Sequence, residues 1–279
     1  MRFLFSSLIV MVVVLSPFTA YSQTGKAKVL LVPYKYKMYF SEIDEELHKA
    51  NNMNFAEINS KFRSAIDQNL FVTLKKTYDP ISFYAFNTKE EEALKELSYI
   101  HSSIGYKYEV LEEEQPETET AKSPVKKFWN KLQEPKTKDP KQPKEAVTDG
   151  QVTTARDTRE KYMMTKITNS NLIPTLNKSY NAQYYLFINQ LDIAPALGSE
   201  FYSAADNSYK RMIKIHYTIF SKSGDVVSSG AKKTYFSGKL NDINKICKQY
   251  IAEASQKIAQ EIQPESQPTE AANKPVVLH

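Results

Sequence analysis

The stretch Tyr184-Tyr185-Leu186-Phe187-Ile188 decides the fold of this chain, because it is apolar at every position. A strand keeps such a run only when both of its faces are covered, so we expect a central strand of a sheet with helices packed on it. Beyond Asn189, polar and apolar residues alternate up to Ile193, with the polar ones at Gln190 and Asp192. This alternation predicts that one face of the strand meets water there.

A long hairpin is predicted to follow this strand. Residues 211–219 alternate in polarity, so the apolar ones should face the core and the polar ones solvent, namely Lys214, His216 and Thr218. The segment Ser221–Asp225 contains turn residues, and Gly224 is free to adopt a positive φ. Val226–Phe236 is then expected to return as the next strand.

The first half of the chain predicts strands that alternate with helices. Lys28–Pro33 is apolar enough to be a second central strand, and Ile81–Phe86 reads as another strand. Asn54 with Glu57 forms a capping box for a helix whose apolar stripe is Phe55, Ile58, Phe62, Ile66, Leu70 and Leu74. A right-handed crossover through this helix would make the two strands parallel.

Three further segments complete the expected elements. A second capping box at Thr88 and Glu91 opens a helix with the stripe Leu94, Leu97 and Ile100. Residues 162–167 fit either a strand or a helix, and Asn169 is expected to cap the helical segment that follows. Asn241 or Asp242 should cap a last helix with the stripe Ile243, Ile246, Cys247, Tyr250, Ala254, Ile258 and Ile262.

Residues 111–158 have a different composition, rich in Pro, Lys, Glu and Thr and almost free of apolar residues. Such a segment buries too little surface to offset its ordering entropy, so we predict a disordered charged insertion. Inside it, one face of a short helix could dock on a partner or a membrane surface, with lysines beside it, through Val125, Phe128, Trp129 and Leu132. The alternative is a solvated insertion that folds back on itself.

The first 22 residues have the pattern of a signal peptide. Arg2 precedes an apolar run, Phe3–Leu15, and Ala20-Tyr21-Ser22 supplies small residues for cleavage after Ser22. The run is too short to span a bilayer comfortably, and no Cys follows that could carry a lipid. We therefore expect export to a periplasm, with neither a lipid anchor nor a membrane span after cleavage.

No pattern in the sequence predicts catalysis. Nucleophile motifs, phosphate loops and dinucleotide fingerprints are missing, the four His residues have no metal-ligand spacing, and the single Cys247 lies in a helix stripe. We therefore predict no catalytic residue, metal or cofactor. The alternative is a hydrolase that uses carboxylates near the end of the central strand, at Asp192, Glu200 and Asp206. His216 is expected to be solvated rather than to act as a base.

The net charge of +5 gives no case for nucleic acid as a partner, although weak contact with acidic envelope polymers is allowed.

The order of the expected elements resembles that of a group of bacterial envelope proteins. The strand Val29-Leu-Leu-Val-Pro33, a capped helix, the Tyr-Tyr-Leu-Phe-Ile strand, a hairpin with Ser-Gly-Asp in its turn and a final amphipathic helix resemble the amino-terminal domain of TolB, and also LpoB and CsgG. The resemblance covers Lys28–Phe86 and residues 169–262. It implies a non-catalytic envelope protein that binds protein partners, and it assigns no site residue. The chain lacks the lipid-carrying Cys of the lipoprotein members, and its insertion is foreign to the pattern.

The sequence thus predicts a single α/β domain, with a mixed sheet of about five strands flanked by helices and a long disordered insertion. Its two halves are residues 24–110 and 159–262, and residues 263–279 are expected to be a disordered tail. The predicted function is that of a periplasmic binding or assembly accessory protein that holds an envelope protein partner, through an exposed sheet edge or the segment around Trp129.

Overall fold

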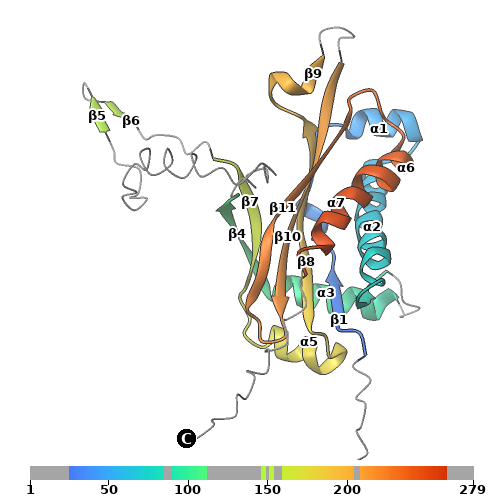
Figure 1. Cartoon of the computed structure of the whole chain (residues 1–279), viewed down its shortest axis with the longest axis vertical. Helices are drawn as coiled ribbons and strands as arrows, with labels where there is room; N and C mark the ends of the chain where they lie inside the picture. Colours follow the sequence, from blue (N-terminus) through green and yellow to red (C-terminus); the bar gives the residue numbers. More distant parts are fainter. Residues whose placement is uncertain are drawn as a thin grey trace, which may run out of the picture.

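The computed structural model describes residues 25–84, 90–111, 146–148, 151–153, 159–203 and 208–262. Its main feature is a mixed sheet of strand order β11-β10-β8-β1-β3 (Figure 1). These strands are β1 (Lys28–Val32), β3 (Asp79–Ser82), β8 (Tyr184–Pro195), β10 (Ser208–Ser221) and β11 (Val226–Ser237). Two short strands extend it: β2 (Tyr39–Ser41) pairs with β8, and β9 (Tyr202–Ser203) pairs with β10. The predicted α/β class with a mixed sheet of about five strands and flanking helices is confirmed.

The two strands that were expected at the centre lie side by side. β1 pairs in parallel with β8, with Val29 opposite Tyr184 and Val32 opposite Phe187. β1 also pairs in parallel with β3, as the predicted crossover requires. Both halves of the chain therefore contribute to one sheet, and the buried stretch Tyr184–Ile188 lies between β1 and β10.

One face of the sheet is covered by helices from both halves of the chain. These are α1 (Asp44–Asn51), α2 (Phe55–Leu74), α6 (Ile243–Ile246) and α7 (Ala252–Ala259), the last two joined by a π-helical turn at Cys247–Ile251. Asn54 and Glu57 form the predicted capping box of α2, and Asp242 caps α6 through its side chain. The predicted stripes of α2 and of the last helix are buried, apart from Tyr250, which is half-buried, and Phe55, which is exposed. Phe55 is 58% exposed and lies in the first turn of α2, where its ring contacts that of His48.

The opposite face is covered in two parts. Near the start of β8 it packs against α3 (Glu90–Ser102) and α5 (Leu172–Tyr180). Leu97 and Ile100 of α3 are buried there as expected, whereas Leu94 is 58% exposed and does not belong to the stripe. Farther along β8, the face is covered by an antiparallel pair, β4 (Ile104–Val110) and β7 (Lys161–Ile167), which we call the ribbon. Figure 1 shows the ribbon across the strands from α2 and α7.

Three strands differ from the prediction. The strand expected at Ile81–Phe86 is β3, which begins earlier and includes Pro80. A proline is tolerated there because β3 is the edge of the sheet, where a backbone N–H can be missing without loss of a ladder bond. The strand Ile104–Val110 was not expected, and Tyr162–Ile167, which was left between strand and helix, is a strand.

The predicted hairpin is present, and Cys247 of the predicted helix stripe lies in the core. β10 and β11 are antiparallel, and Gly224 in their connecting turn has a φ of +92°. Cys247 is buried, and burial raises the pKa of its thiol to about 12, so the thiol is protonated and unreactive.

Several predictions fall outside the described residues: the signal peptide, the tail 263–279, Asp206 and the docking residues Val125, Phe128, Trp129 and Leu132. Of the insertion 111–158, the structure describes Leu111 and the backbone of a short hairpin, β5 (Ala146–Thr148) with β6 (Gln151–Thr153). None of the described helices has the length and apolar character needed to cross a bilayer.

Candidate functional site: a ribbon fixed over the sheet

The ribbon is the part of the fold that carries the insertion. The pairing of β4 with β7 runs from Ile104 and Ile167 at one end to Val110 and Lys161 at the other. One further hydrogen bond joins the Leu111 N–H to the Glu160 carbonyl at 2.8 Å. The 48 residues between Leu111 and Glu160 therefore leave and re-enter the fold at neighbouring points.

A β-bulge in β8 prepares the surface under the ribbon. Ile188 pairs with Tyr217 and Gln190 pairs with His216, so Asn189 has no partner residue on β10. The extra residue lets Asn189 and Gln190 both turn toward the ribbon, while the following apolar residues return to the helix-covered face. The change of alternation at Asn189 in the sequence is the signature of this bulge.

The face that was expected to meet water is instead a buried polar layer. Lys214, His216 and Thr218 are 6%, 1% and 0% exposed, because β7 crosses directly above them. Gln190 is also buried, and Asp192 is half-buried. The prediction of a wet face was wrong because alternation identifies two different faces but does not reveal that a second, distant pair of strands covers the polar one.

His216 uses both ring nitrogens, one toward the ribbon and one toward the neighbouring strand β8 of the sheet. Nδ1 accepts the Met163 backbone N–H at 2.8 Å, which places the proton on Nε2, and Nε2 donates to Asp192 Oδ2 at 2.8 Å. Burial lowers the pKa of His216, outweighing the opposing effect of the Asp192 carboxylate, so the ring is neutral at neutral pH. The expectation of a solvated His216 was therefore wrong.

Asn189 joins the same two layers through its side-chain amide. Its Nδ2 donates to the Met163 carbonyl at 2.7 Å and to Thr218 Oγ1 at 2.9 Å, and its Oδ1 accepts from Thr165 Oγ1 at 2.6 Å. Thr218 Oγ1 also accepts the Thr165 backbone N–H at 3.0 Å. The ribbon is thus attached through its backbone as well as its side chains, which fixes its position along the sheet.

A charged group closes the layer at the end nearest the insertion. Glu160 accepts from Lys214 at 2.8 Å through one oxygen and from Lys233 through the other. Lys214 also donates to the Lys161 carbonyl at 2.7 Å. Burial would raise the pKa of Glu160, but the two lysines outweigh it and lower the pKa, so the carboxylate is ionised. Two strands of the main sheet therefore hold the point at which the chain re-enters the fold.

This arrangement offers structural attachment rather than acid–base chemistry. Both His216 nitrogens are engaged and its ring is buried, and the Asp192 oxygens accept from His216 and from Gln190. Glu200, the other described carboxylate of the predicted group, lies in a short 3-10 turn, Ser199–Phe201, beyond the end of β8. The described ranges contain no group of His, Cys, Asp or Glu placed to hold a metal.

The sequence did not identify the members of the polar layer as a site. Lys214, His216 and Thr218 were noticed for their alternation but assigned to solvent, and Glu160, Thr165 and Asn189 were not singled out for contact. The change of alternation at Asn189 could have revealed the polar layer. It indicates a bulge that turns two polar residues to one side of a central strand, and buried polar residues require hydrogen-bonding partners from the element that covers them.

Comparison with known proteins adds little to this description. No family model matches the chain, and no curated protein sequence matches it. Solved structures of similar arrangement include lipoprotein GNA1162 from Neisseria meningitidis (7% identity, TM-score 0.31, 84% of this chain and 99% of that one). Others are the PelC dodecamer from Paraburkholderia phytofirmans (8%, 0.29, 83% and 86%) and hypothetical protein CT253 from Chlamydia trachomatis (8%, 0.35, 85% and 93%).

Similarities this weak carry no argument about function. None of these structures is TolB, LpoB or CsgG, so that resemblance stays a prediction.

Proposed function

We propose that this chain is a non-catalytic accessory protein of the bacterial cell envelope, exported to the periplasm, which holds a protein partner through its insertion. The apolar leader that ends at Ser22 supports export, and the first residue after cleavage should be Gln23. Sequencing the amino terminus of the mature protein tests this point. Recovery of Met1 or Arg2 there would exclude export by cleavage.

The observation that carries the proposal is the attachment of the ribbon to the sheet. Burying a lysine, a histidine and several amide and hydroxyl groups is costly unless they find partners, and the ribbon supplies partners to Lys214, His216 and Asn189. An apolar interface would hold two strands equally well, so the polar layer favours one position of the ribbon over others. We infer that this position matters because it fixes both ends of the insertion.

The chemistry of the insertion indicates what it would hold. Phe128 and Trp129 can fill an apolar groove, and Lys126, Lys127 and Lys131 lie beside them in sequence. A few residues supply most of the binding free energy in a protein interface, and Trp is enriched among them. The lysines favour a groove with acidic margins. We therefore propose a protein partner that has an apolar groove with acidic margins. Its groove would bind the side chains of Val125, Phe128, Trp129 and Leu132.

The structure permits a direct test by removal of the insertion. Because Leu111 and Glu160 are hydrogen-bonded neighbours, residues 112–159 can be replaced by Asn-Gly, which turns β4 and β7 into an ordinary hairpin. We expect the variant to keep its melting temperature within about 3 °C, since none of the described contacts of the polar layer is removed. It should at the same time lose its partner.

Partner contact is measured by a photo-cross-linking residue placed at position 129 in the native envelope, with Val72 on α2 as an exposed control position. The proposal predicts a discrete adduct with one envelope protein from position 129 alone, which disappears when Phe128→Ala and Leu132→Ala are added. Adducts that are the same from both positions, or none from position 129, would contradict it.

No observation favours the alternative of an envelope hydrolase. Asp192, the described carboxylate nearest to a histidine, already accepts from two side chains. The substitution Asp192→Asn tests the alternative, because a hydrolase would lose activity, whereas in our proposal the variant is only less stable.

A further inference from the structure

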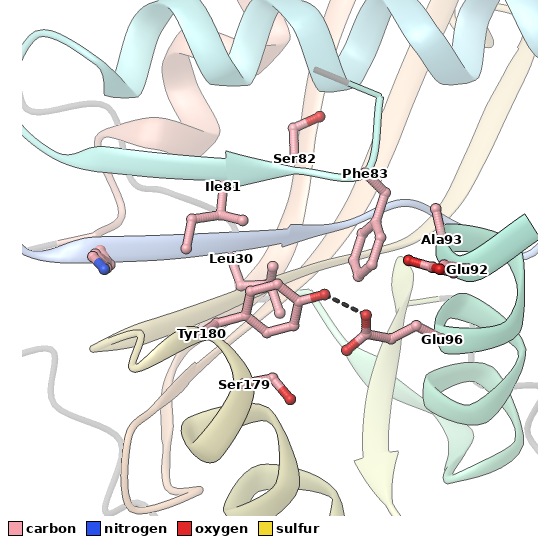
Figure 2. Close-up of a pocket in the computed structure, with 10 residues that line it drawn as sticks. Leu30, Ile81, Ser82, Phe83, Glu92, Ala93, Glu96, Ser179 and Tyr180 are labelled. Carbon is pink, nitrogen blue, oxygen red and sulfur yellow. Dashed lines mark hydrogen bonds between the residues drawn. The ribbon is translucent and has the colours of Figure 1, made fainter. Parts of the chain in front are cut away.

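A cavity of about 380 Å³ lies at the end of the sheet away from the insertion. It opens between the edge strand β3, the first residues of β1, and the helices α3 and α5 (Figure 2). The lining residues named below all belong to the described part of the chain. Its volume lies within the range of pockets that bind small molecules.

The walls of the cavity are mainly apolar and partly aromatic. Leu30 forms part of one wall and Ile81 lies beside it on the edge strand. The rings of Phe83 and Tyr180 meet edge to face, with their centroids 6.1 Å apart and their planes at 75°. Tyr180 reaches across the space between the strands and α3, as Figure 2 shows. These surfaces fit a flat apolar group, which would bury its faces against the rings.

One end of the cavity is negatively charged. Glu92 and Glu96 are one turn apart on α3, so both side chains lie on the helix face that borders the cavity. The Tyr180 hydroxyl donates a hydrogen bond to Glu96 Oε2. Burial and the Glu96 carboxylate raise the pKa of Tyr180, so the hydroxyl stays protonated and keeps one oxygen of Glu96 directed toward the cavity.

We propose that this cavity binds a small organic cation with a flat apolar body, with the body between Leu30, Phe83 and Tyr180 and the ammonium group against Glu92 and Glu96. An anion is disfavoured, because it would place its charge beside two carboxylates. Among the described residues that line the cavity, the basic one is Lys28. It lies on β1 two residues before Leu30, so it is separated from α3 by the apolar walls. The site uses none of the residues that hold the ribbon, and it is therefore independent of the function proposed above.

Two probes of the same shape and opposite charge test this proposal on the full mature chain. Tryptamine supplies an aromatic body with an ammonium group, and indole-3-propionate supplies the same body with a carboxylate. In protein-observed NMR titrations, tryptamine should shift the amide signals of Ile81, Ala93 and Glu96, with a dissociation constant of about 2 mM, as expected for a ligand of this size. Indole-3-propionate should bind roughly tenfold more weakly.

Three variants separate the site from nonspecific contact. Glu92→Gln with Glu96→Gln removes the charge with little change of shape and should weaken tryptamine binding roughly tenfold. Ala93→Leu fills the cavity from α3 and should abolish binding, with thermal unfolding as the check that the variant is folded. Glu253→Gln on α7 removes an exposed carboxylate elsewhere and should change nothing.

Three results would contradict the proposal of a cation site. Equal binding of the two probes, full binding by the double Glu variant, or no shift of the cavity amides at about 10 mM tryptamine would each overturn the proposal.

Discussion

At the scale of single residues, His216 is the side chain on which the candidate site depends most. It is 1% exposed and joins the Met163 backbone N–H of the ribbon to the Asp192 carboxylate of the sheet. A leucine of similar size would fill the space but leave the N–H buried and unpaired. Loss of one partner in a buried hydrogen-bonded pair costs more than the bond itself is worth, because the remaining group stays desolvated.

We therefore expect His216→Leu to lower the free energy of unfolding by about 2–3 kcal/mol at pH 7.5, measured by urea denaturation. His48→Gln is the matched control, because His48 makes one exposed hydrogen bond, and it should change stability by less than about 0.5 kcal/mol. An effect of His216→Leu as small as that of the control would mean that the ribbon does not need this contact.

The pKa of His216 gives the same variant a definite pH dependence. Because burial lowers the pKa in the folded protein, the unfolded chain binds more protons once the pH falls below about 6.5, the ordinary value. The stability contributed by neutral His216 is therefore present above that pH and is lost as the pH falls toward the folded pKa. Urea titrations should show a larger difference between wild type and His216→Leu at pH 7.5 than at pH 5.5. A difference that grows on acidification would show that the folded site prefers the charged ring.

At the scale of elements, the bulge in β8 and the ribbon form one structural unit. The extra residue at Asn189 supplies the amide that contacts the Met163 carbonyl, Thr165 and Thr218. Without the bulge, the polar residues beyond it would point to the helix-covered face, where Ile213 and Ile215 are packed. The unit explains why a strand buried on both sides changes from apolar to polar in its middle.

This unit predicts energetic coupling between the strand and the ribbon. In a double-mutant cycle of Asn189→Ala with Thr165→Val, each single variant should be destabilised, and the two effects should be non-additive by about 1 kcal/mol, because both remove the same hydrogen bond. Equilibrium denaturation measures all four proteins. Additive effects would mean that Asn189 and Thr165 do not interact in solution.

The elements also show which part of the fold the sequence could reveal. The stripe from Ile58 to Leu74, the apolar runs of β1 and β8 and the turn at Gly224 are local patterns with one physical reading each, and all were predicted. The ribbon was not predicted as a pair of strands. The sequence around Tyr106 and Lys107 shows no clear alternation of polar and apolar residues, and the residues that pair with them lie about 60 positions later in the chain. Without the ribbon, the polar face of β10 could only be assigned to water.

At the scale of the whole molecule, the fold separates two regions of different chemistry. The cavity near Tyr180 lies by the start of β1, and the ribbon extends from the same face of the sheet toward the opposite end, where the insertion begins (Figure 1). Deleting the insertion should therefore leave the binding of small cations unchanged. In the same way, filling the cavity should leave partner contact unchanged.

The central claim is that the ribbon is fixed to the sheet as a rigid base for the insertion, and native-state amide hydrogen exchange tests it most directly. The N–H groups of Met163 and Thr165 bond to side chains of β10, so their protection reports attachment of the ribbon itself. The account predicts protection close to that of the amides at the centre of β8. Exchange of Met163 and Thr165 at the rate of an exposed loop, with β8 still protected, would contradict it.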